Sequence, residues 1–312
     1  MYKKIIFVML LIWIAFGTAC SASNDRGSAD ADTENETITI EHELDTTEVM
    51  KNPETVVVFD FGILDSMDQL GLDVAGVPQD LIPSYLEQYA SDEYANVGSL
   101  KEPDFDKIAE INPDLIIISA RQANVYEQLA EIAPTIHLGV EPTRYMESFK
   151  ENMATLGEIF DKEREVESEL EAIDESISAL KETAEANADE SLVILANDDK
   201  ISAYGPKSRF GLIHDVFGLP AVDKGVEAST HGMNVSFEYV MEQNPDILYV
   251  IDRTAAINEG SAAKIVENEL VENTTAFKND DIYYLDPDVW YLSGGGLISV
   301  QKMVDEIAAS LD

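Results

Sequence analysis

The residues best suited to bind a charged ligand are three arginines at the ends of predicted secondary-structure elements. Arg121 and Arg253 each follow a run of aliphatic residues, and Arg209 follows residues 205–208, where a loop enters a predicted helix. The arginine side chain presents a rigid fork of donors that matches planar oxygen groups. The three positions therefore predict a site for an anion. The competing interpretation is that each arginine pairs with a nearby carboxylate such as Asp252.

Arg121 and Arg253 are the last residues of two copies of one sequence pattern. Residues 105–121 (FDKIAEINPDLIIISAR) and 237–253 (FEYVMEQNPDILYVIDR) align without a gap. The residue before a proline is pushed away from the helical region, so each copy predicts a helix that ends before Asn-Pro-Asp. The aliphatic run that follows predicts a buried parallel strand. Because ligands bind beyond the carboxyl ends of such strands, we expect two similar α/β lobes, each offering one arginine to a shared space.

Two further side chains could take part in a metal site. His231 lies in a loop just before the second copy, and Tyr291 stands close before the glycines 294–296. The histidine is either a metal ligand or an unengaged loop residue, since no second histidine or cysteine stands at zinc spacing. The glycines match neither a P-loop nor a dinucleotide motif, and they favour a turn that brings the backbone close to the last helix. Tyr291 and its neighbour Trp290 belong either to the core or to a pocket.

The composition excludes several classes of protein. The chain has 312 residues, 61 acidic against 20 basic, and a formal net charge of −41. Binding to nucleic acid or to an anionic lipid surface needs a basic face, so we predict neither. The sequence also has no Gly-x-Ser-x-Gly or His-Glu-x-x-His motif, and we predict a protein that is not an enzyme.

The N-terminal residues have the features of a secretory signal. Two lysines precede an apolar run that ends near Phe16, and small residues then precede Cys20, the one cysteine of the chain. The run is short for a transmembrane helix. We predict a signal peptide at residues 1–19, lipidation at Cys20, and a flexible spacer over residues 20–37. The alternative is an ordinary signal peptide with an incidental cysteine.

The rest of the chain is predicted to form two lobes and a connector. Residues 38–142 and 189–312 read as the N-terminal and C-terminal α/β lobes. In the second part of residues 143–188, apolar side chains recur every three or four positions, which predicts one stripe along a long helix. The stripe is too short to favour a coiled coil. We therefore expect a helical connector that packs on both lobes.

Together these features resemble a family of bacterial binding proteins. Two Rossmann-like lobes joined by one long α-helix, behind a lipobox-like cysteine, resemble the ABC-transporter binding proteins for siderophores, haem and vitamin B12. This is the helical-backbone type of metal and siderophore receptor. The segments ANVGSLKEPDF, YGPKSRFG, STHG and VWYLSGGG resemble the branch that binds ferric catecholate siderophores, petrobactin-like or tetradentate. The resemblance covers nearly all of the chain from about residue 45.

The resemblance implies a role for each candidate residue. It implies that Arg121, Arg209 and Arg253 grip the anionic ferric complex. It also implies that His231 and Tyr291 complete the iron shell when the siderophore leaves two positions open. Phenolate oxygen suits hard Fe(III), and imidazole is an acceptable neighbour.

The resemblance also implies a partner. Asp106 and Glu238, the second residues of the two copies, stand where the family docks on basic pockets of an ABC permease. We thus expect a monomer, lipid-anchored at the extracytoplasmic face of the cell membrane, that delivers a ferric siderophore and holds no intrinsic cofactor. The alternatives are the same fold binding haem, a corrinoid or a hydroxamate siderophore and, from another class, a cell-surface enzyme.

Overall fold

The computed structural model describes residues 36–257 and 260–311. The predicted signal peptide, the lipidation site Cys20 and most of the predicted spacer lie outside the described residues. Among the helices that the structure describes, none combines the length and the apolar character needed to cross a membrane.

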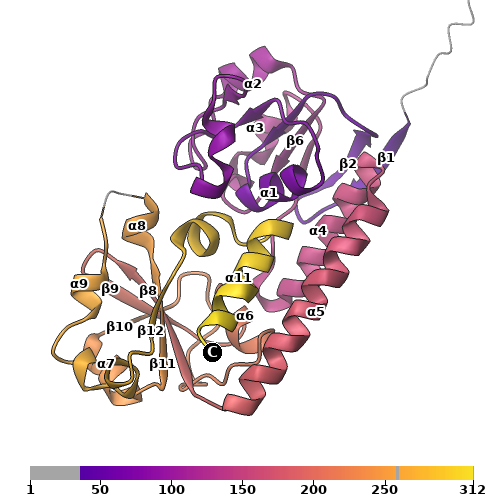
Figure 1. The fold of residues 1–312 in the computed structure, drawn as a ribbon. Helices are drawn as coiled ribbons and strands as arrows, with labels where there is room; N and C mark the ends of the chain where they lie inside the picture. Colours follow the sequence, from indigo (N-terminus) through magenta and orange to yellow (C-terminus); the bar gives the residue numbers. More distant parts are fainter. Residues whose placement is uncertain (1–35, 258–259, 312) are drawn as a thin grey trace, which may run out of the picture. The chain divides into compact units, whose positions relative to one another are not determined.

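The first lobe is built on a five-stranded parallel sheet with the strand order β5-β4-β3-β6-β7. Alternate residues of its central strands pack on opposite faces, one beneath α1 and the other beneath α2 and α3. An antiparallel hairpin of β1 and β2 precedes the sheet (Figure 1). The elements are β1 (Thr37–Glu41), β2 (Thr46–Met50), β3 (Val56–Val58), α1 (Phe61–Gln69), β4 (Gly76–Val77), η1 (Ser84–Ala90), β5 (Ala95–Asn96), α2 (Phe105–Ile111), β6 (Leu115–Ile118), η2 (Ala123–Val125), α3 (Tyr126–Ala130) and β7 (Thr135–His137).

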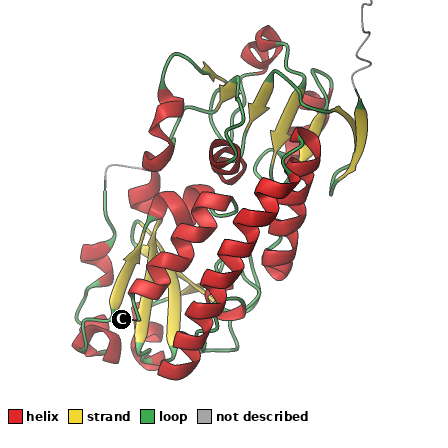
Figure 2. Cartoon of the chain, turned by 45° about the vertical axis from the view of Figure 1, so that its right-hand side comes forward, coloured by secondary structure: helices red, strands yellow, loops and turns green. Residues whose placement is uncertain are grey.

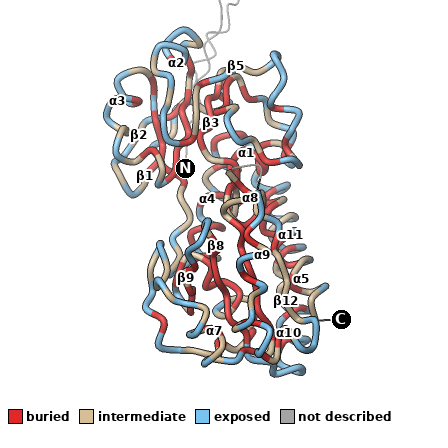
Figure 3. Tube along the Cα trace, turned by 90° about the vertical axis from the view of Figure 1, so that its left-hand side faces the viewer, coloured by how far each residue is buried: buried red, intermediate tan, exposed pale blue. Residues whose placement is uncertain are grey.

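The second lobe has a mixed five-stranded sheet with the order β10-β9-β8-β11-β12. Strands β8, β11 and β12 are parallel, and β9 is the antiparallel hairpin partner of β8. The central strands are buried (Figure 3). The elements are β8 (Ser191–Asn197), β9 (Lys200–Tyr204), α6 (Leu212–Asp215), β10 (Met233–Val235), α7 (Phe237–Gln243), β11 (Ile247–Asp252), α8 (Arg253–Ile257), α9 (Ala263–Val266), η4 (Val271–Asn273), α10 (Thr275–Lys278) and β12 (Ile282–Leu285).

The connector is a pair of helices, α4 (Tyr145–Phe160) and α5 (Glu163–Asn187), after the short turn η3 (Pro142–Arg144). The predicted stripe along α5 is buried in, or packs against, one hydrophobic core that includes residues of both lobes. Glu169 near its start accepts a hydrogen bond from α1 at 3.0 Å, and Asn187 at its end donates to the carbonyl of Leu311 at 3.3 Å. Helix α5 therefore packs on both lobes, as the periodicity indicates (Figure 2).

A second helix, α11 (Leu297–Ala309), also joins the lobes. At its N-terminus the backbone N–H groups of Ile298 and Ser299 donate to the carboxylate of Asp65, on α1 of the first lobe, at 3.1 Å each. A helix N-terminus favours such a negative charge. Burial raises the pKa of Asp65 to about 7, although its donors oppose the change. At the other end, Ser310 lies 2.7 Å from the hydroxyl of Tyr249 in β11.

The glycine run before α11 has a steric reason. A side chain at Gly296 would collide with the carboxylate of Asp65 and the carbonyl of Gly62. The backbone therefore passes close to α1 at this point, as the predicted turn requires. The segment just before the glycines is the π-helix η5 (Asp288–Ser293), which the sequence did not predict.

The two copies of the repeat end their helices in the same way. Asn112 and Asn244 follow α2 and α7 in the left-handed region, with φ angles of 52° and 47°. Asparagine tolerates this conformation better than most residues, and it reverses the chain before the proline. Each copy then continues into a fully buried parallel strand. The helix–Asn-Pro-Asp–strand prediction is therefore confirmed in both lobes.

Two predicted helices differ from the observed ones. The segment DSMDQLGL predicts a helix over residues 65–72, but α1 begins at Phe61, because the Asp60 side chain accepts the N–H groups of Gly62 and Ile63. The segment SRFGLIHDVFG predicts a helix over residues 208–218, and this prediction is wrong in extent, since α6 covers only the single turn Leu212–Asp215. There the Ser208 hydroxyl donates to the carbonyl of residue 205 and stabilises a turn in place of a helix.

Candidate ligand-binding site

The three arginines converge on one residue, Tyr291. Arg121 and Arg209 each donate an Nη2–H to the Tyr291 carbonyl oxygen, at 2.9 and 2.8 Å. Arg253 donates Nε–H to the Tyr291 phenol oxygen at 2.6 Å. The arginine that ends each repeat copy thus meets the other around a tyrosine from the C-terminal part of the chain.

Strand ends position two of these arginines. Arg121 lies shortly after β6 and Arg253 directly after β11, each at the carboxyl end of a parallel strand. Arg209 lies in the turn between β9 and α6, where its own N–H donates to the carbonyl of Ser229 at 3.3 Å. Tyr291 belongs to η5. The arrangement agrees with the rule that open α/β sheets bind ligands beyond their carboxyl ends.

Among the described residues, the three guanidinium groups have no carboxylate partner. In residues 36–257 and 260–311, none of the ion pairs includes Arg121, Arg209 or Arg253. Asp252 accepts the N–H groups of residues 255 and 262 instead, at 3.0 and 2.6 Å. The alternative that Asp252 pairs with its neighbouring arginine is therefore wrong. The second contact of Arg253 is neutral: its Nη1 donates to Asn197 Oδ1 at 2.6 Å.

The concentrated positive charge changes the proton affinities of the site. Burial favours the neutral phenol of Tyr291, but the hydrogen bond from Arg253 and the charges of all three arginines lower its pKa overall. Burial, followed by the like charge of Arg121, lowers the pKa of Arg209. The arrangement therefore favours an anionic oxygen among the arginines.

Aromatic rings surround Arg209. Its guanidinium carbon lies 4.7 Å from the ring centre of Tyr291 and 5.0 Å from that of Phe210. Tyr204 packs edge-on against Phe210, with their ring centres 4.7 Å apart. Such contacts stabilise a cation. Sequence reasoning missed Asn197, Tyr204 and Phe210 as parts of the site, although Asn197 ends a predicted strand, a position that could have identified it.

His231 does not join this cluster of hydrogen bonds. Its side chain is exposed, and its backbone N–H donates to Ser229 Oγ at 3.1 Å. Over the described ranges, no group of three or more histidine, cysteine, aspartate or glutamate side chains is arranged to hold a metal ion. A role of His231 and Tyr291 on iron stays a prediction.

Asp106 and Glu238 lie in the first turns of α2 and α7, and both are exposed. A hydrogen bond from Ser236 lowers the pKa of the Glu238 carboxyl. Matching positions in the two copies thus present a carboxylate to solvent.

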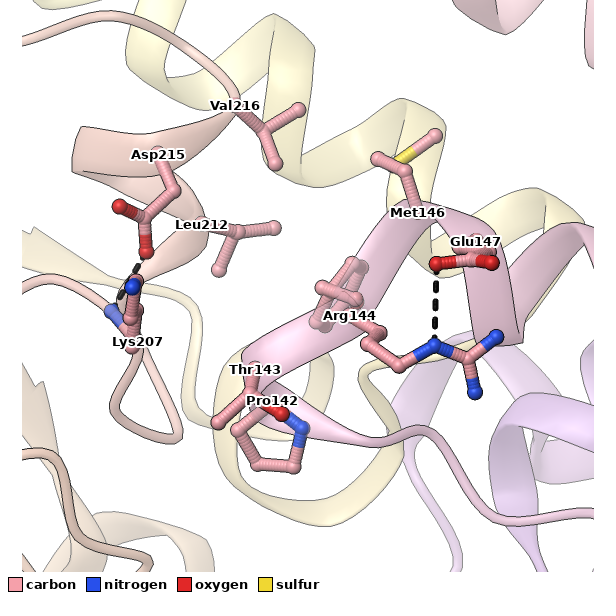
Figure 4. Close-up of a pocket in the computed structure, with 10 residues that line it drawn as sticks. Pro142, Thr143, Arg144, Met146, Glu147, Lys207, Leu212, Asp215 and Val216 are labelled. Carbon is pink, nitrogen blue, oxygen red and sulfur yellow. Dashed lines mark hydrogen bonds and ion pairs between the residues drawn. The ribbon is translucent and has the colours of Figure 1, made fainter.

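A separate pocket of about 310 Å³ lies between η3–α4 and the region of α6 (Figure 4). Its lining includes Tyr145, Lys207 and Leu212 but none of the three site arginines. The Arg144 side chain at this pocket contacts Glu147 at 2.9 Å, a pairing between two exposed side chains. The pocket is therefore distinct from the arginine cluster, where Tyr291 lies against the guanidinium groups.

Comparison with known proteins identifies the family. Residues 56–289 match the model of the periplasmic binding protein family. The chain belongs to this family, which confirms the predicted fold class and the resemblance drawn from the sequence.

Individual relatives extend along nearly the whole chain. The petrobactin-binding protein YclQ of Bacillus subtilis strain 168 is 53% identical over 313 residues, which cover 98% of this chain and 99% of that protein. The crystal structure of YclQ matches with a TM-score of 0.87 at 56% identity, over 89% of this chain and 99% of that one.

Two further solved structures show the same fold. The periplasmic catecholate-siderophore binding protein VctP of Vibrio cholerae has a TM-score of 0.83 and 36% identity, over 88% of this chain and all (100%) of that one. The siderophore-binding protein BauB, bound to a complex of two acinetobactin molecules and ferric iron, has a TM-score of 0.82 and 32% identity, over 89% and 99%. All three of these relatives are described as binding proteins.

Proposed function

We propose that this member of the periplasmic binding protein family captures a ferric catecholate siderophore, petrobactin-like or tetradentate, and delivers it to an ABC importer. The observation that carries the proposal is the meeting of Arg121, Arg209 and Arg253 with only neutral acceptors, in a chain of net charge −41. Three cations that meet in one place, with no carboxylate partner among the described residues, favour a strongly anionic ligand. Hydroxamate complexes carry less negative charge, so the arginines favour catecholates over them.

The relatives support this choice of ligand. YclQ is named for petrobactin, VctP for catecholate siderophores, and BauB holds a ferric siderophore complex. None of the three is described as an enzyme, and the proposed role requires no reaction and no resident cofactor. Haem and corrinoids remain the alternative ligands of the same fold.

Tyr291 and His231 would contact iron only in a complex that leaves two positions open. The arginines around Tyr291 favour its phenolate form, which is the form that Fe(III) prefers. His231 lies in the exposed loop that also contacts Arg209 through the carbonyl of Ser229. A hexadentate siderophore would leave no position for either side chain.

Delivery would use the matching carboxylates of the two lobes. We infer that Asp106 and Glu238 engage basic pockets of the permease, one on each lobe. In the proposed protein Cys20 carries the lipid anchor, the chain is monomeric, and the lobes work at the extracytoplasmic face of the membrane.

The test is a binding titration of the full chain in detergent with ferric catecholate complexes. Quenching of Trp290, which is buried beside Tyr291, reports binding. Replacing Arg121, Arg209 or Arg253 by Ala should weaken binding about 10- to 100-fold each, because hydrogen bonds to charged groups contribute roughly 1.5–3 kcal/mol.

Arg144→Ala is the matched control, since that arginine pairs with exposed glutamates. The proposal fails if catecholate complexes do not quench, if haem or a corrinoid binds more tightly, or if the three variants bind like wild type. For the iron contact, Tyr291→Phe should shift the charge-transfer band of a tetradentate ferric complex. An unchanged spectrum would exclude Tyr291 from the iron shell.

A further inference from the structure

We propose that Asn197 sets the charge of the ligand that the site accepts, because it orients Arg253 without neutralising it. The inference rests on the proposed function for the identity of the ligand. It concerns a residue that acts through Arg253, and it depends on the difference between a carboxamide and a carboxylate at one position.

The contacts of Arg253 show how its guanidinium group is oriented. Nη1 donates to Asn197 Oδ1 at 2.6 Å, and Nε donates to the Tyr291 phenol oxygen at 2.6 Å. Two acceptors on different edges of a planar group fix its orientation. Asn197 ends β8, the strand that pairs with β11 just before Arg253, and it holds the fork in place whatever the phenol contacts.

The sheet holds Asn197 in register with Arg253. In the parallel pairing of β8 and β11, Ala196 lies opposite Asp252, so the next residues of the two strands emerge side by side. The N–H of Asp198 also donates to the Thr254 hydroxyl at 2.9 Å. The backbone on both sides of the contact is thus fixed, which leaves the side chain as the variable part.

Asn197 is a neutral partner of Arg253 although several aspartates lie close to it in the sequence. Two aspartates, Asp198 and Asp199, follow it, and Asp252 precedes Arg253. Yet in the part of the chain that the structure describes, no carboxylate pairs with Arg253, and the Asp252 carboxylate is turned to backbone N–H groups. Aspartate has the shape of asparagine, so it would fit at position 197 and form a charge-assisted pair with Arg253. Asparagine gives the same orientation and leaves three full positive charges for the ligand.

Three substitutions separate orientation from charge. Asn197→Asp keeps the contact and cancels one positive charge, so it should weaken ferric catecholate binding. The loss of affinity should grow about fivefold with each additional negative charge on the complex. Asn197→Ala keeps the charge and loses the contact, so it should weaken all complexes by a similar factor. Asn197→Ser restores a short neutral acceptor and should recover part of the affinity.

The experiment uses the full chain in detergent and two probes, a tetradentate ferric bis-catecholate and a hexadentate ferric tris-catecholate of higher negative charge. Asn279→Asp is the matched control. It makes the same change of charge in the same lobe. Asn279 is exposed and precedes β12, so it lies at the amino-terminal ends of the parallel strands, away from the arginines at their carboxyl ends. The ratio of the two affinities should fall in Asn197→Asp and stay unchanged in Asn279→Asp and Asn197→Ala. Equal ratios in all variants would overturn the inference.

A measurement without ligand separates this inference from the proposed function. Asn197→Asp should raise Tm by about 2 °C, since it relieves repulsion among three like charges, whereas Asn279→Asp should not. If wild type binds no ferric catecholate but the melting temperatures differ as expected, the proposed function fails and the role of Asn197 in the charge balance stands. If Asn197→Asp neither stabilises the protein nor changes the affinity ratio, the inference is wrong.

Discussion

The two copies of the repeat share their backbone and differ in how they hold their arginines. Each has a helix, a left-handed asparagine, a proline and a buried strand. In the described part of the chain, however, the Arg121 side chain donates to main-chain oxygens alone, the carbonyls of Tyr291 and Leu292 at 2.9 and 3.4 Å. Arg253 contacts two side chains, Tyr291 and Asn197.

The difference shows that the same helix–strand repeat can hold its final arginine in two ways, through main-chain carbonyls in one lobe and through side chains in the other. In the first lobe, the direction of Arg121 depends on the path of η5, which comes from the far end of the chain. In the second lobe, the direction of Arg253 depends on side chains and can change with a single substitution. Sequence variation in the second lobe is thus the simpler way to alter the ligand, and variation in the first lobe would have to move the backbone.

The largest expected difference between the copies concerns their aspartates. Asp114 Oδ2 accepts the N–H groups of Glu54 and Thr55, at 3.1 and 2.9 Å, whereas Asp246 Oδ2 accepts that of Glu190 alone, at 3.1 Å. Because each bond to a carboxylate contributes roughly 1.5 kcal/mol, Asp114→Ala should lower the free energy of unfolding by about 3 kcal/mol and Asp246→Ala by about half as much. Denaturant unfolding measures both, and equal losses would show that the copies are anchored alike.

A double-mutant cycle tests the two supports of the arginines. Tyr291→Phe removes the acceptor of Arg253 but leaves the carbonyl that Arg121 contacts. We expect a coupling free energy of about 1–2 kcal/mol between Arg253→Ala and Tyr291→Phe, and less than about 0.5 kcal/mol with Arg121→Ala. The measurement is the affinity for a hexadentate ferric catecholate, which leaves no position on iron for the phenol. Coupling of the same size in both cycles would contradict the asymmetry.

The left-handed asparagines give a smaller difference. The side chain of Asn244 binds Thr275, accepting its N–H at 2.9 Å and donating to its hydroxyl at 3.0 Å, and no such bond is described for Asn112 in residues 36–257 and 260–311. Glycine also fits this backbone conformation. Asn244→Gly should therefore cost about 1 kcal/mol of stability, and Asn112→Gly should change it by less than about 0.5 kcal/mol. Thermal melts of the two variants check the order.

The smallest effect is expected at the exposed carboxylates. Asp106→Ala and Glu238→Ala should each change stability by less than about 0.5 kcal/mol and leave ligand affinity unchanged. Uptake of iron by cells that depend on this protein should nevertheless fall for both variants, since the proposed permease contact is lost. Normal uptake with both residues replaced would remove these positions from the docking surface.

The parts of the molecule that the sequence predicted are those with local signals. Asn-Pro-Asp steps, aliphatic runs and the spacing along α5 each depend on a few neighbouring residues, and they located both sheets and the arginines at the strand ends. The group on which the arginines converge, Tyr291, was not predictable in this way. Arg121 and the Tyr291 carbonyl are 170 positions apart, and the carbonyl is presented by a π-helix that no pattern indicated.

Side-chain bonds that compete with regular structure explain other differences. The Ser208 hydroxyl closes a turn where an apolar pattern favoured a helix, and Asp60 starts α1 earlier than the hydrophobic pattern indicates. Asn197 was overlooked because an asparagine at a strand end is ordinary until its partner is known. The exposed position of His231 likewise has no signal in the sequence.

The contact between Asp65 and α11 limits how the protein can move. The carboxyl group is fully buried and accepts hydrogen bonds from the backbone N–H groups at the helix N-terminus. The Tyr85 hydroxyl lies 3.0 Å from this carboxylate and 2.7 Å from the hydroxyl of Ser293 in η5. Drawing the lobes apart would remove several hydrogen-bond donors from this buried carboxyl group at once, a loss of several kcal/mol. Any relative movement of the lobes therefore has to preserve or break this set of hydrogen bonds, and η5 is joined to it through Ser293.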